Sequence, residues 1–574
     1  MKEKKFSKFN LIAIICIIIF SVTLSQKTLQ NDTFYTIKIG EHIIDTKEVD
    51  MKEPFSWHEN MSYTYPHWLY DTGIYLIYNV GSNIATSLNS EAENGGLTAI
   101  YISTMLIASI LGILIYYSNI KISKNHILSL FLTLGVVYCL KDFLAARAQL
   151  VSYICFTLEI LFIELLLKSG KKRYGVSLFI IATLIANLHA AVWYMFFILA
   201  LPYLGEWILI KIMESNLSCN VQLVTIDKKI RNYEKKIKKD NNKDKIKQKI
   251  EELQNKMEKI KILKEKRNKA VEKMEENSLR IKYIKRDNIK LLIIILIICI
   301  FSGLLTPQTS FEPYTHIFKL MKGNSTSRIS EHQPIILIDS IETLVILTIL
   351  AIMLMFTDTK VTLKDLFMLI GLFFLTLMSR RQTSLLALIG VYSVNIIIWD
   401  FVIKYDNINI EEKIINKITT GYGTLVIILL AILLGVNFYG KKYQYNYIDE
   451  SSYPVGVAQY ILDNLDTNEI KIYNSYNFGS YLLYKGIPVF IDSRCDLYTK
   501  EFNGRNIFFD ALDIEGLASS SYYEDKFEEY GVTHVITYDD SSFKMILEHD
   551  DNYKIIYNDD NFYLFERISI KEGE

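Results

Sequence analysis

Long apolar segments alternate with short polar ones through the first 440 residues of the chain. A membrane-spanning helix needs about 20 apolar residues, and somewhat fewer where the helix is buried in protein. The pattern therefore predicts about eleven transmembrane helices, at 10–25, 97–117, 126–141, 149–167, 174–188, 190–210, 290–306, 335–356, 365–379, 383–403 and 421–440. The apolar segment from Trp68 to Asn79 is too short to span, and a helix lying at the membrane interface is predicted there.

The N-terminus resembles a signal peptide, because several lysines precede the first apolar run. No small-x-small cleavage pattern follows Leu24, and many apolar segments come later in the chain. An uncleaved first transmembrane helix is therefore predicted.

The distribution of positive charge predicts which side of the membrane each loop faces, because cytoplasmic loops carry an excess of Lys and Arg. With a cytoplasmic N-terminus and alternating sides, the short cytoplasmic stretches hold 15 Lys and Arg in 48 residues. The outer stretches hold 11 in 111 residues, so the bias has the expected sign. An odd number of spans then places the residues after 440 outside the cell membrane.

A formal net charge of +0 hides two oppositely charged parts of the chain. Residues 227–290 hold 24 Lys and Arg against 12 Asp and Glu, whereas residues 441–574 hold 12 against 25. The composition, 50% hydrophobic and 22% charged, fits a chain divided between lipid and water. Six cysteines without CxxC or metal-type spacing predict single buried thiols rather than a disulfide framework.

The basic insert at 226–288 is predicted to form a cytoplasmic helical hairpin or short coiled coil. A turn at Asp240-Asn241-Asn242 could join its two helices. A 4-3 repeat, interrupted by Lys264, Arg267 and Ser278, runs through its apolar residues Ile246, Ile250, Leu253, Met257, Ile260, Val271, Met274 and Ile281. A structural role is favoured, although the positive charge could also contact anionic lipid headgroups.

Residues 441–574 are predicted to form an extracytoplasmic α/β domain with a partly parallel sheet, because short β-rich runs alternate with helical patterns. The predicted strands are 470–474, 488–492, 533–537, 554–557 and 562–565, and the predicted helices are 455–466, 478–484 and 523–530. No GxGxxG motif or P-loop occurs, so nucleotide binding has no support and no nucleic-acid partner is expected.

Candidate chemistry concentrates in the outer stretch 26–96, which holds ten acidic residues beside many aromatic ones. A carboxylate held there could deprotonate an incoming hydroxyl, or bind a divalent cation beside a phosphate. The alternative is that these residues are solvated loop charges and interfacial anchors. A metal requirement stays undecided, since the chain has no His/Cys cluster and carboxylates alone suit Mg²⁺ or Mn²⁺ only weakly.

Short motifs along the chain resemble a large, mostly uncharacterised bacterial group related to the GT-C glycosyltransferases. The first follows the first span as NDTFYTIKIGEHII at 31–44 and is similar to that group's Asp-x-aromatic-aromatic-x₄-Gly-x-x-Ile pattern. Further matches are EPFSW at 53–57, HWLYD at 67–71, RAQL at 147–150, NLH at 187–189, ISEHQP at 329–334, GSYL at 479–482 and VFIDSRCDLY at 489–498. The chain departs from the group by lacking a Glu after His67 and a Pro after Arg147, and by having His332 where Trp is common.

This resemblance implies a transfer of sugar from a polyprenyl-phosphate carrier to an envelope glycan or protein at the outer face of the plasma membrane. By position, Asp32 matches the catalytic acid of the first outer loop and would act as the base. The substrate-binding candidates are Arg147, His189, Glu53, Asp71, Glu331, Arg380 and Arg381. The arginines would meet the phosphate charge.

Alternatives stay open at several of these residues. Arg380 and Arg381 could instead extend to lipid headgroups, and His189 could be a satisfied core histidine. Asp492 and Arg494, at the end of a predicted strand, could form a structural ion pair rather than a ligand site.

The fold class expected from the sequence is an α-helical polytopic membrane protein, GT-C-like, with its N-terminus in the cytoplasm. Its domains are a transmembrane part at 1–440, the insert at 226–288 within it, and the outer α/β domain at 441–574. A non-catalytic envelope assembly protein that binds a partner through its outer domain is the main alternative. A transporter is less favoured, because charges inside the predicted spans are nearly absent.

Overall fold

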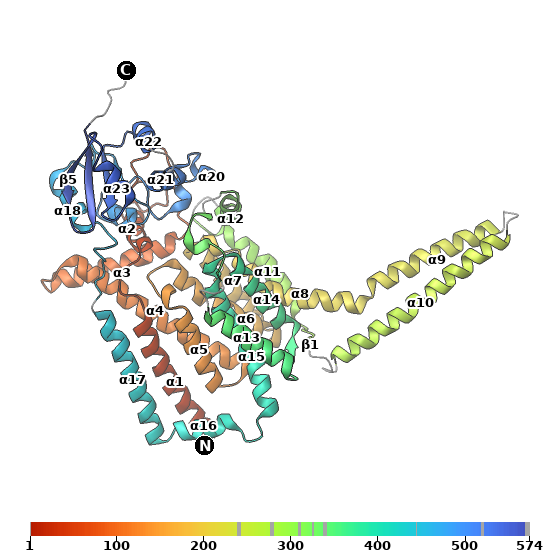
Figure 1. Ribbon diagram of the computed structural model, residues 1–574. Coiled ribbons are helices and arrows are strands. Elements are labelled where there is room, and N and C mark those ends of the chain that lie inside the picture. The colour runs from red at the N-terminus through yellow and green to blue at the C-terminus, as the bar shows by residue number, and fades with distance from the viewer. Residues whose placement is uncertain are drawn as a thin grey trace.

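The computed structural model describes residues 2–237, 243–275, 281–307, 311–323, 327–336, 341–443, 445–517 and 522–568. The predicted turn at 240–242 lies outside these residues, as do positions 276–280 of the insert and 337–340 of one expected span. The described chain is mostly helical, with a small sheet near its C-terminal end. The N-terminus and the C-terminal region lie at opposite ends of the helical bundle (Figure 1).

Apolar helices build the bundle. They are α1 (Lys2–Leu24), α4 (Ala92–Ser123), α5 (Ile127–Cys139), α6 (Ala148–Ser169), α7 (Lys172–Leu188), α8 (Met195–Ser215), α11 (Ile289–Ile300), α13 (Ile341–Phe356), α14 (Leu363–Met378), α15 (Thr383–Tyr405) and α17 (Gly421–Tyr443). Each of the eleven expected spans overlaps one of them. The shorter helices α12 (Glu312–Lys322) and α16 (Ile410–Ile418) connect parts of the bundle.

Five of the described helices are long and apolar enough to cross a membrane, at Phe6–Leu24, Ala92–Ser123, Ala148–Ser169, Ala190–Ile212 and Arg380–Tyr405. A sixth crossing is possible if Ile410–Ile418 and Gly421–Asn437, which are bent by 82°, form one broken span. The chain is therefore a multi-pass membrane protein, and the count of eleven spans stays a prediction.

Helix α6 contains more charged residues than we expected inside the predicted spans. Glu159, in the middle of α6, is fully buried. Five residues further on, Glu164 contacts Arg286 at 3.3 Å and Lys364 at 3.2 Å. The expectation that the spans are nearly free of charge is wrong for α6.

The first outer stretch is largely helical rather than a loop. It forms α2 (Asn31–Thr46) and α3 (Trp68–Ser87), which lie between the bundle and the C-terminal region (Figure 1). Phe34 and Ile37, spaced by one helical turn, are buried on the inner face of α2. Lys47 ends the helix in a left-handed conformation, and its N–H bonds to the Ile43 carbonyl.

The C-terminal region contains helices around one four-stranded sheet. The helices are α18 (Val455–Asn464), α19 (Gly479–Tyr484), α20 (Lys500–Asn503), α21 (Ile507–Glu515), α22 (Tyr522–Tyr530) and α23 (Ser542–Leu547). The strands are β3 (Ile472–Tyr473), β4 (His534–Tyr538), β5 (Tyr553–Asn558) and β6 (Phe562–Arg567), in the order β3-β4-β6-β5. The β3–β4 pair is parallel, whereas β4–β6 and β5–β6 are antiparallel.

The predicted strand at 488–492 is wrong. Residues 489–492 are buried, but Val489 forms only an isolated parallel bridge, to Ser56 of the first outer stretch. The same stretch bonds again where the Trp57 indole N–H donates to the Ile472 carbonyl at 3.0 Å. Phe34 of α2 adds edge contacts to the rings of Tyr453 and Tyr481, at 5.0 and 5.3 Å between centroids. The C-terminal region and the first outer stretch therefore share one core.

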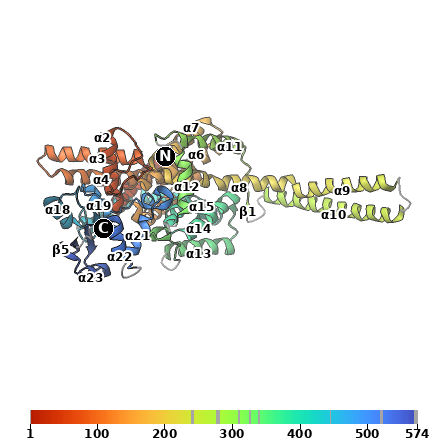
Figure 2. The ribbon, with the colours of Figure 1, turned by 90° about the horizontal axis from the view of Figure 1, so that it is seen from above.

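The basic insert forms two long helices, α9 (Leu217–Ile237) and α10 (Lys243–Glu275), which lie side by side and extend away from the bundle (Figures 1 and 2). Ile226 and Ile230 of α9 are buried against Ile260 of α10. Beyond the insert, β1 (Ile281–Lys282) pairs in parallel with β2 (Val361–Thr362), which ties the returning chain to the start of α14.

Candidate active site

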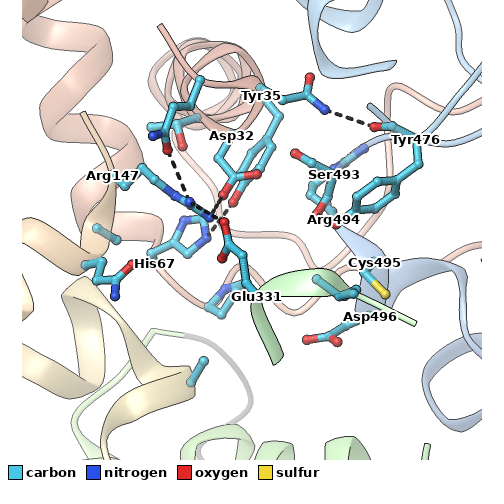
Figure 3. Close-up of a pocket in the computed structure, with 18 of the residues that line it drawn as sticks. Asp32, Tyr35, His67, Arg147, Glu331, Tyr476, Ser493, Arg494, Cys495 and Asp496 are labelled. Atoms are coloured by element: carbon cyan, nitrogen blue, oxygen red, sulfur yellow. Dashed lines mark hydrogen bonds and ion pairs between the residues drawn. The ribbon is translucent and has the colours of Figure 1, made fainter. Parts of the chain in front are cut away.

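A cavity of about 640 Å³ lies where α2, the start of α6 and the C-terminal region meet. Figure 3 shows the side chains of Asp32, Arg147 and Glu331 pointing toward one another. Among the sequence candidates, Asp32, Arg147, His189, Glu331 and Arg381 line the cavity. The structure thus brings five residues together that are spread over 350 positions of the sequence.

Asp32 lies in the first turn of α2, where the helix N-terminus favours negative charge. Its carboxylate forms an ion pair with Arg147, the residue that precedes the first turn of α6. The side chains of both residues are about one-fifth exposed, 22% for Asp32 and 20% for Arg147. A charge-paired carboxylate is therefore open to the cavity rather than sealed in a core.

Arg147 is held from several sides. Its guanidinium donates to the Gln30 side-chain oxygen at 3.1 Å, and Glu331 lies 3.6 Å from it. Burial alone would lower the pKa of Arg147, but Asp32 and Glu331 outweigh it and raise that pKa above its ordinary value. Arg147 therefore carries a permanent positive charge at the cavity wall.

His189 and Arg381, at the ends of bundle helices, line the same cavity. The His189 ring contacts the Ser152 hydroxyl at 2.9 Å, and burial, then the neighbouring His67 and Arg381, hold the pKa of His189 well below its usual range. Arg381 donates to the Gln149 side-chain oxygen at 3.2 Å. A neutral imidazole and a cation therefore face the cavity together.

Arg380 lies outside the cavity lining in the described part of the chain, although it is adjacent to Arg381 in sequence. Its backbone N–H donates to the Gln333 carbonyl at 2.8 Å, which joins this turn to the Glu331 segment. Of these two adjacent arginines, which the sequence analysis proposed together, only Arg381 lines the cavity.

Glu53 and Asp71 do not line the cavity, but each contacts a residue that does. Both carboxylate oxygens of Glu53 accept from Arg494, at 2.5 and 3.0 Å, and Arg494 lines the cavity. Arg494 also pairs with Asp492 at 2.6 Å, so the structure contains the Asp–Arg pair that the sequence left as an alternative. Asp71 is fully buried against His67, which lines the cavity.

Several lining residues escaped the sequence analysis. Tyr35 and His67 are the clearest cases, and Gln149, His316, Tyr476 and Asp496 also line the cavity. The signal for Tyr35 was its spacing of three from Asp32 on one helix, and for His67 its spacing of four from Asp71. Asp496 lies within the motif at 489–498, whereas for Tyr476 the sequence offers no comparable local signal.

Metal ligation was left undecided by the sequence. Among the residues that the structure describes, no group of three or more His, Cys, Asp or Glu side chains is arranged to hold an ion. The two carboxylates that line the cavity beside Arg147, Asp32 and Glu331, both contact that arginine.

Gly40 positions the helix that carries Asp32. A Cβ atom at residue 40 would lie 2.2 Å from the Asp71 carbonyl oxygen and 2.6 Å from the Tyr75 Cβ, so α2 and α3 can pack this closely only with glycine. Gly40→Ala should therefore push α2 away from α3 and lower stability by about 1–3 kcal/mol, measured as the unfolding midpoint in detergent. Gly73→Ala is the matched control, because a Cβ there meets nothing within 4 Å. Equal stability of the two variants would contradict this role.

Comparisons with known proteins bear on the fold. No protein-family model matches the sequence, and no curated protein does either. Among solved structures, the chain is similar to the oligosaccharyltransferase of Archaeoglobus fulgidus in its apo form, with a TM-score of 0.52 and 11% sequence identity. The similarity covers 92% of this chain and 69% of the archaeal one. The GT-C-like fold expected from the sequence is confirmed: this chain shares the fold of that oligosaccharyltransferase, which is of the GT-C type.

Proposed function

We propose that the protein is a membrane glycosyltransferase that moves a sugar from a polyprenyl-phosphate carrier to an envelope glycan or protein. The observation that carries this proposal is the pairing of Asp32 with Arg147 at a cavity between the bundle and the C-terminal region. The solved structure with the similar fold is, by its name, an oligosaccharyltransferase. A donor with a phosphate end and a sugar end matches a wall that carries both cations and an acid.

The proposed reaction uses these groups in one displacement. The Asp32 carboxylate takes the proton of the acceptor hydroxyl while the acceptor oxygen forms a bond to the anomeric carbon. The bond from that carbon to the carrier phosphate breaks, and its electron pair stays on the phosphate oxygen. Arg147 and Arg381 meet the negative charge that develops there. Glu331 and His189 complete the cavity wall. Glu53 holds Arg494 in place and Asp71 holds His67, so these two acids affect the site indirectly.

The proposed orientation places the N-terminus and the insert at 226–288 in the cytoplasm and the domain at 441–574 outside the plasma membrane. The excess of Lys and Arg in the short cytoplasmic stretches supports it. So does the location of the N-terminus and the C-terminal region at opposite ends of the bundle (Figure 1). The cavity then opens on the outer side, where membrane lipids and envelope acceptors meet.

Reconstituted full-length protein tests the function. Proteoliposomes would be given synthetic polyprenyl-monophosphate hexoses, and release of polyprenyl phosphate would be measured. We expect at least one donor to be consumed. Arg381→Gln should lower kcat/KM for that donor about tenfold or more, because it removes a charged hydrogen-bond donor from the wall. Arg380→Gln, the matched control outside the lining, should stay within about twofold.

Two results would overturn the proposal. The first is folded protein that consumes no donor across the panel, which would favour the non-catalytic envelope alternative. The second is an equal loss in both arginine variants, which would mean that the cavity does not hold the phosphate.

A further inference from the structure

A buried chain of three polar side chains leads into the cavity beside Asp32. Asp71, in the first turn of α3, is fully buried, and its two oxygens lie 2.8 and 2.9 Å from His67 Nδ1. The other ring nitrogen of His67, Nε2, lies 3.1 Å from the Tyr35 hydroxyl. Tyr35 and His67 are 7% and 8% exposed and both line the cavity. The order of contacts is therefore Asp71, His67, Tyr35, cavity.

The chemistry of the groups sets the direction of these hydrogen bonds. Burial raises the pKa of Asp71, and the contacts with His67 and the Thr36 hydroxyl oppose this rise. A carboxylate only accepts, so Nδ1 of His67 carries a proton, and a ring with a single proton then leaves Nε2 as an acceptor. Burial, and then Asp32, raise the pKa of Tyr35 well above its ordinary value, so its hydroxyl keeps its proton. That proton is donated to His67.

The consequence for the cavity is a hydroxyl oxygen without a proton to offer. The Tyr35 O–H is committed to His67, and only the lone pairs of the oxygen remain for a ligand. Tyr35 follows Asp32 by three residues, so both lie on the same face of α2 (Figure 3). A phosphate oxygen also only accepts, and it gains nothing from such a partner. A sugar hydroxyl can donate to it.

We propose that Asp71 and His67 fix Tyr35 as a hydrogen-bond acceptor that positions a hydroxyl of the substrate sugar beside Asp32. The proposal rests on the glycosyltransferase function above and assigns the two ends of the donor to different residues of the site. Cations at Arg147 and Arg381 select the phosphate end of the donor, and the Tyr35 oxygen selects its sugar end. Tyr35 is a specificity-determining residue, and His67 and Asp71 are positioning residues that act through it.

The protonation of His67 can be tested without any substrate. Full-length protein labelled with ¹⁵N-histidine would be placed in lipid nanodiscs, and the His67 signals assigned by their loss in His67→Gln. In the wild-type protein we expect the proton on Nδ1. Tyr35→Phe should change mainly the ¹⁵N signal of Nε2, and Asp71→Asn should move the proton to Nε2. A wild-type ring protonated on Nε2, or on both nitrogens at neutral pH, would overturn the proposal.

Deoxy sugars test the recognition itself. The donor consumed by the wild-type protein would be compared with analogues that each lack one hydroxyl. Tyr35→Phe should lower kcat/KM for the full sugar about tenfold, and it should lose nothing on the one analogue that lacks the recognised hydroxyl. Tyr70→Phe is the control, because Tyr70 is buried beside Asp71 but lies outside the cavity lining.

The outcomes separate the two proposals. If Tyr35→Phe loses the same factor on every analogue, or loses nothing on the full sugar, the recognition role is wrong while the enzyme remains a glycosyltransferase. If the wild-type protein consumes no donor, the proposed function fails, and the His67 protonation still decides whether Tyr35 presents an acceptor to the cavity.

Discussion

Replacing Asp32 with asparagine should abolish sugar transfer, with a fall in rate of about 10²–10⁴-fold or more. Asparagine has the size and shape of aspartate, but its amide cannot take the acceptor proton. Arg147 would keep its contacts with Gln30 and Glu331, so the cavity wall should survive the change. The measurement is the initial rate of transfer in proteoliposomes, with the unfolding midpoint recorded for the same preparation.

Asp45→Asn provides the matched control for this experiment. Asp45 lies at the other end of α2 and is exposed, away from the cavity lining. The Asp45→Asn variant removes the same charge from the same helix as Asp32→Asn, and it should keep the wild-type rate. A D32N protein that retains more than about a tenth of that rate would remove Asp32 from the role of base.

Arg494→Met should lower the free energy of unfolding by about 3–5 kcal/mol, because it leaves two buried carboxylates without their partner. The side chains of Glu53 and Asp492 are both 0% exposed, and Arg494 is 2% exposed. The guanidinium binds both carboxylates, and the Tyr498 hydroxyl donates to Asp492 at 2.6 Å. Glu53 belongs to the first outer stretch, so the same change should also loosen the C-terminal region from α2.

Equilibrium unfolding in mixed micelles measures this loss, and trypsin cleavage after residue 440 reports the loosening. Lys485→Met is the matched control, since Lys485 pairs with Glu93 at 2.7 Å across the same two parts of the chain. These two side chains are 25% and 29% exposed, and such a pair contributes about 0–1 kcal/mol. If the two variants lose equal stability, the buried cluster does not hold the interface.

Local pattern accounts for much of the fold. Apolar segments located every helix of the bundle, because lipid and protein interiors both demand continuous apolar runs. The apolar run at 488–492 was wrongly predicted to be a strand because apolar runs indicate burial, whatever the partner. Its residues are as buried as a central strand, yet the partner of Val489 is Ser56, which no local pattern could indicate. The interfacial helix expected at Trp68–Asn79 became α3, which begins at Trp68 and continues to Ser87.

The site was harder to foresee than the spans. Asp32 was singled out by resemblance to a motif, and its ion pair with Arg147 joins residues 115 positions apart. Glu53 could be taken for a substrate ligand because its partner, Arg494, lies 441 positions away. Glu159 shows the opposite failure, since two acids in a strongly apolar span hardly change its mean hydropathy. Long-range charge pairing is what the one-dimensional pattern omits.

The wall of the cavity combines residues from α2 with residues as late as Asp496 and Phe502. A ribosome must therefore synthesise the chain through Phe502 before this wall can close. The described apolar helices α1 to α17 precede that region, and a nascent chain that stalls before it displays Asp32 and Arg147 without a complete cavity around them. If the proposed sugar transfer is correct, a translation product that ends before the C-terminal region should be inactive.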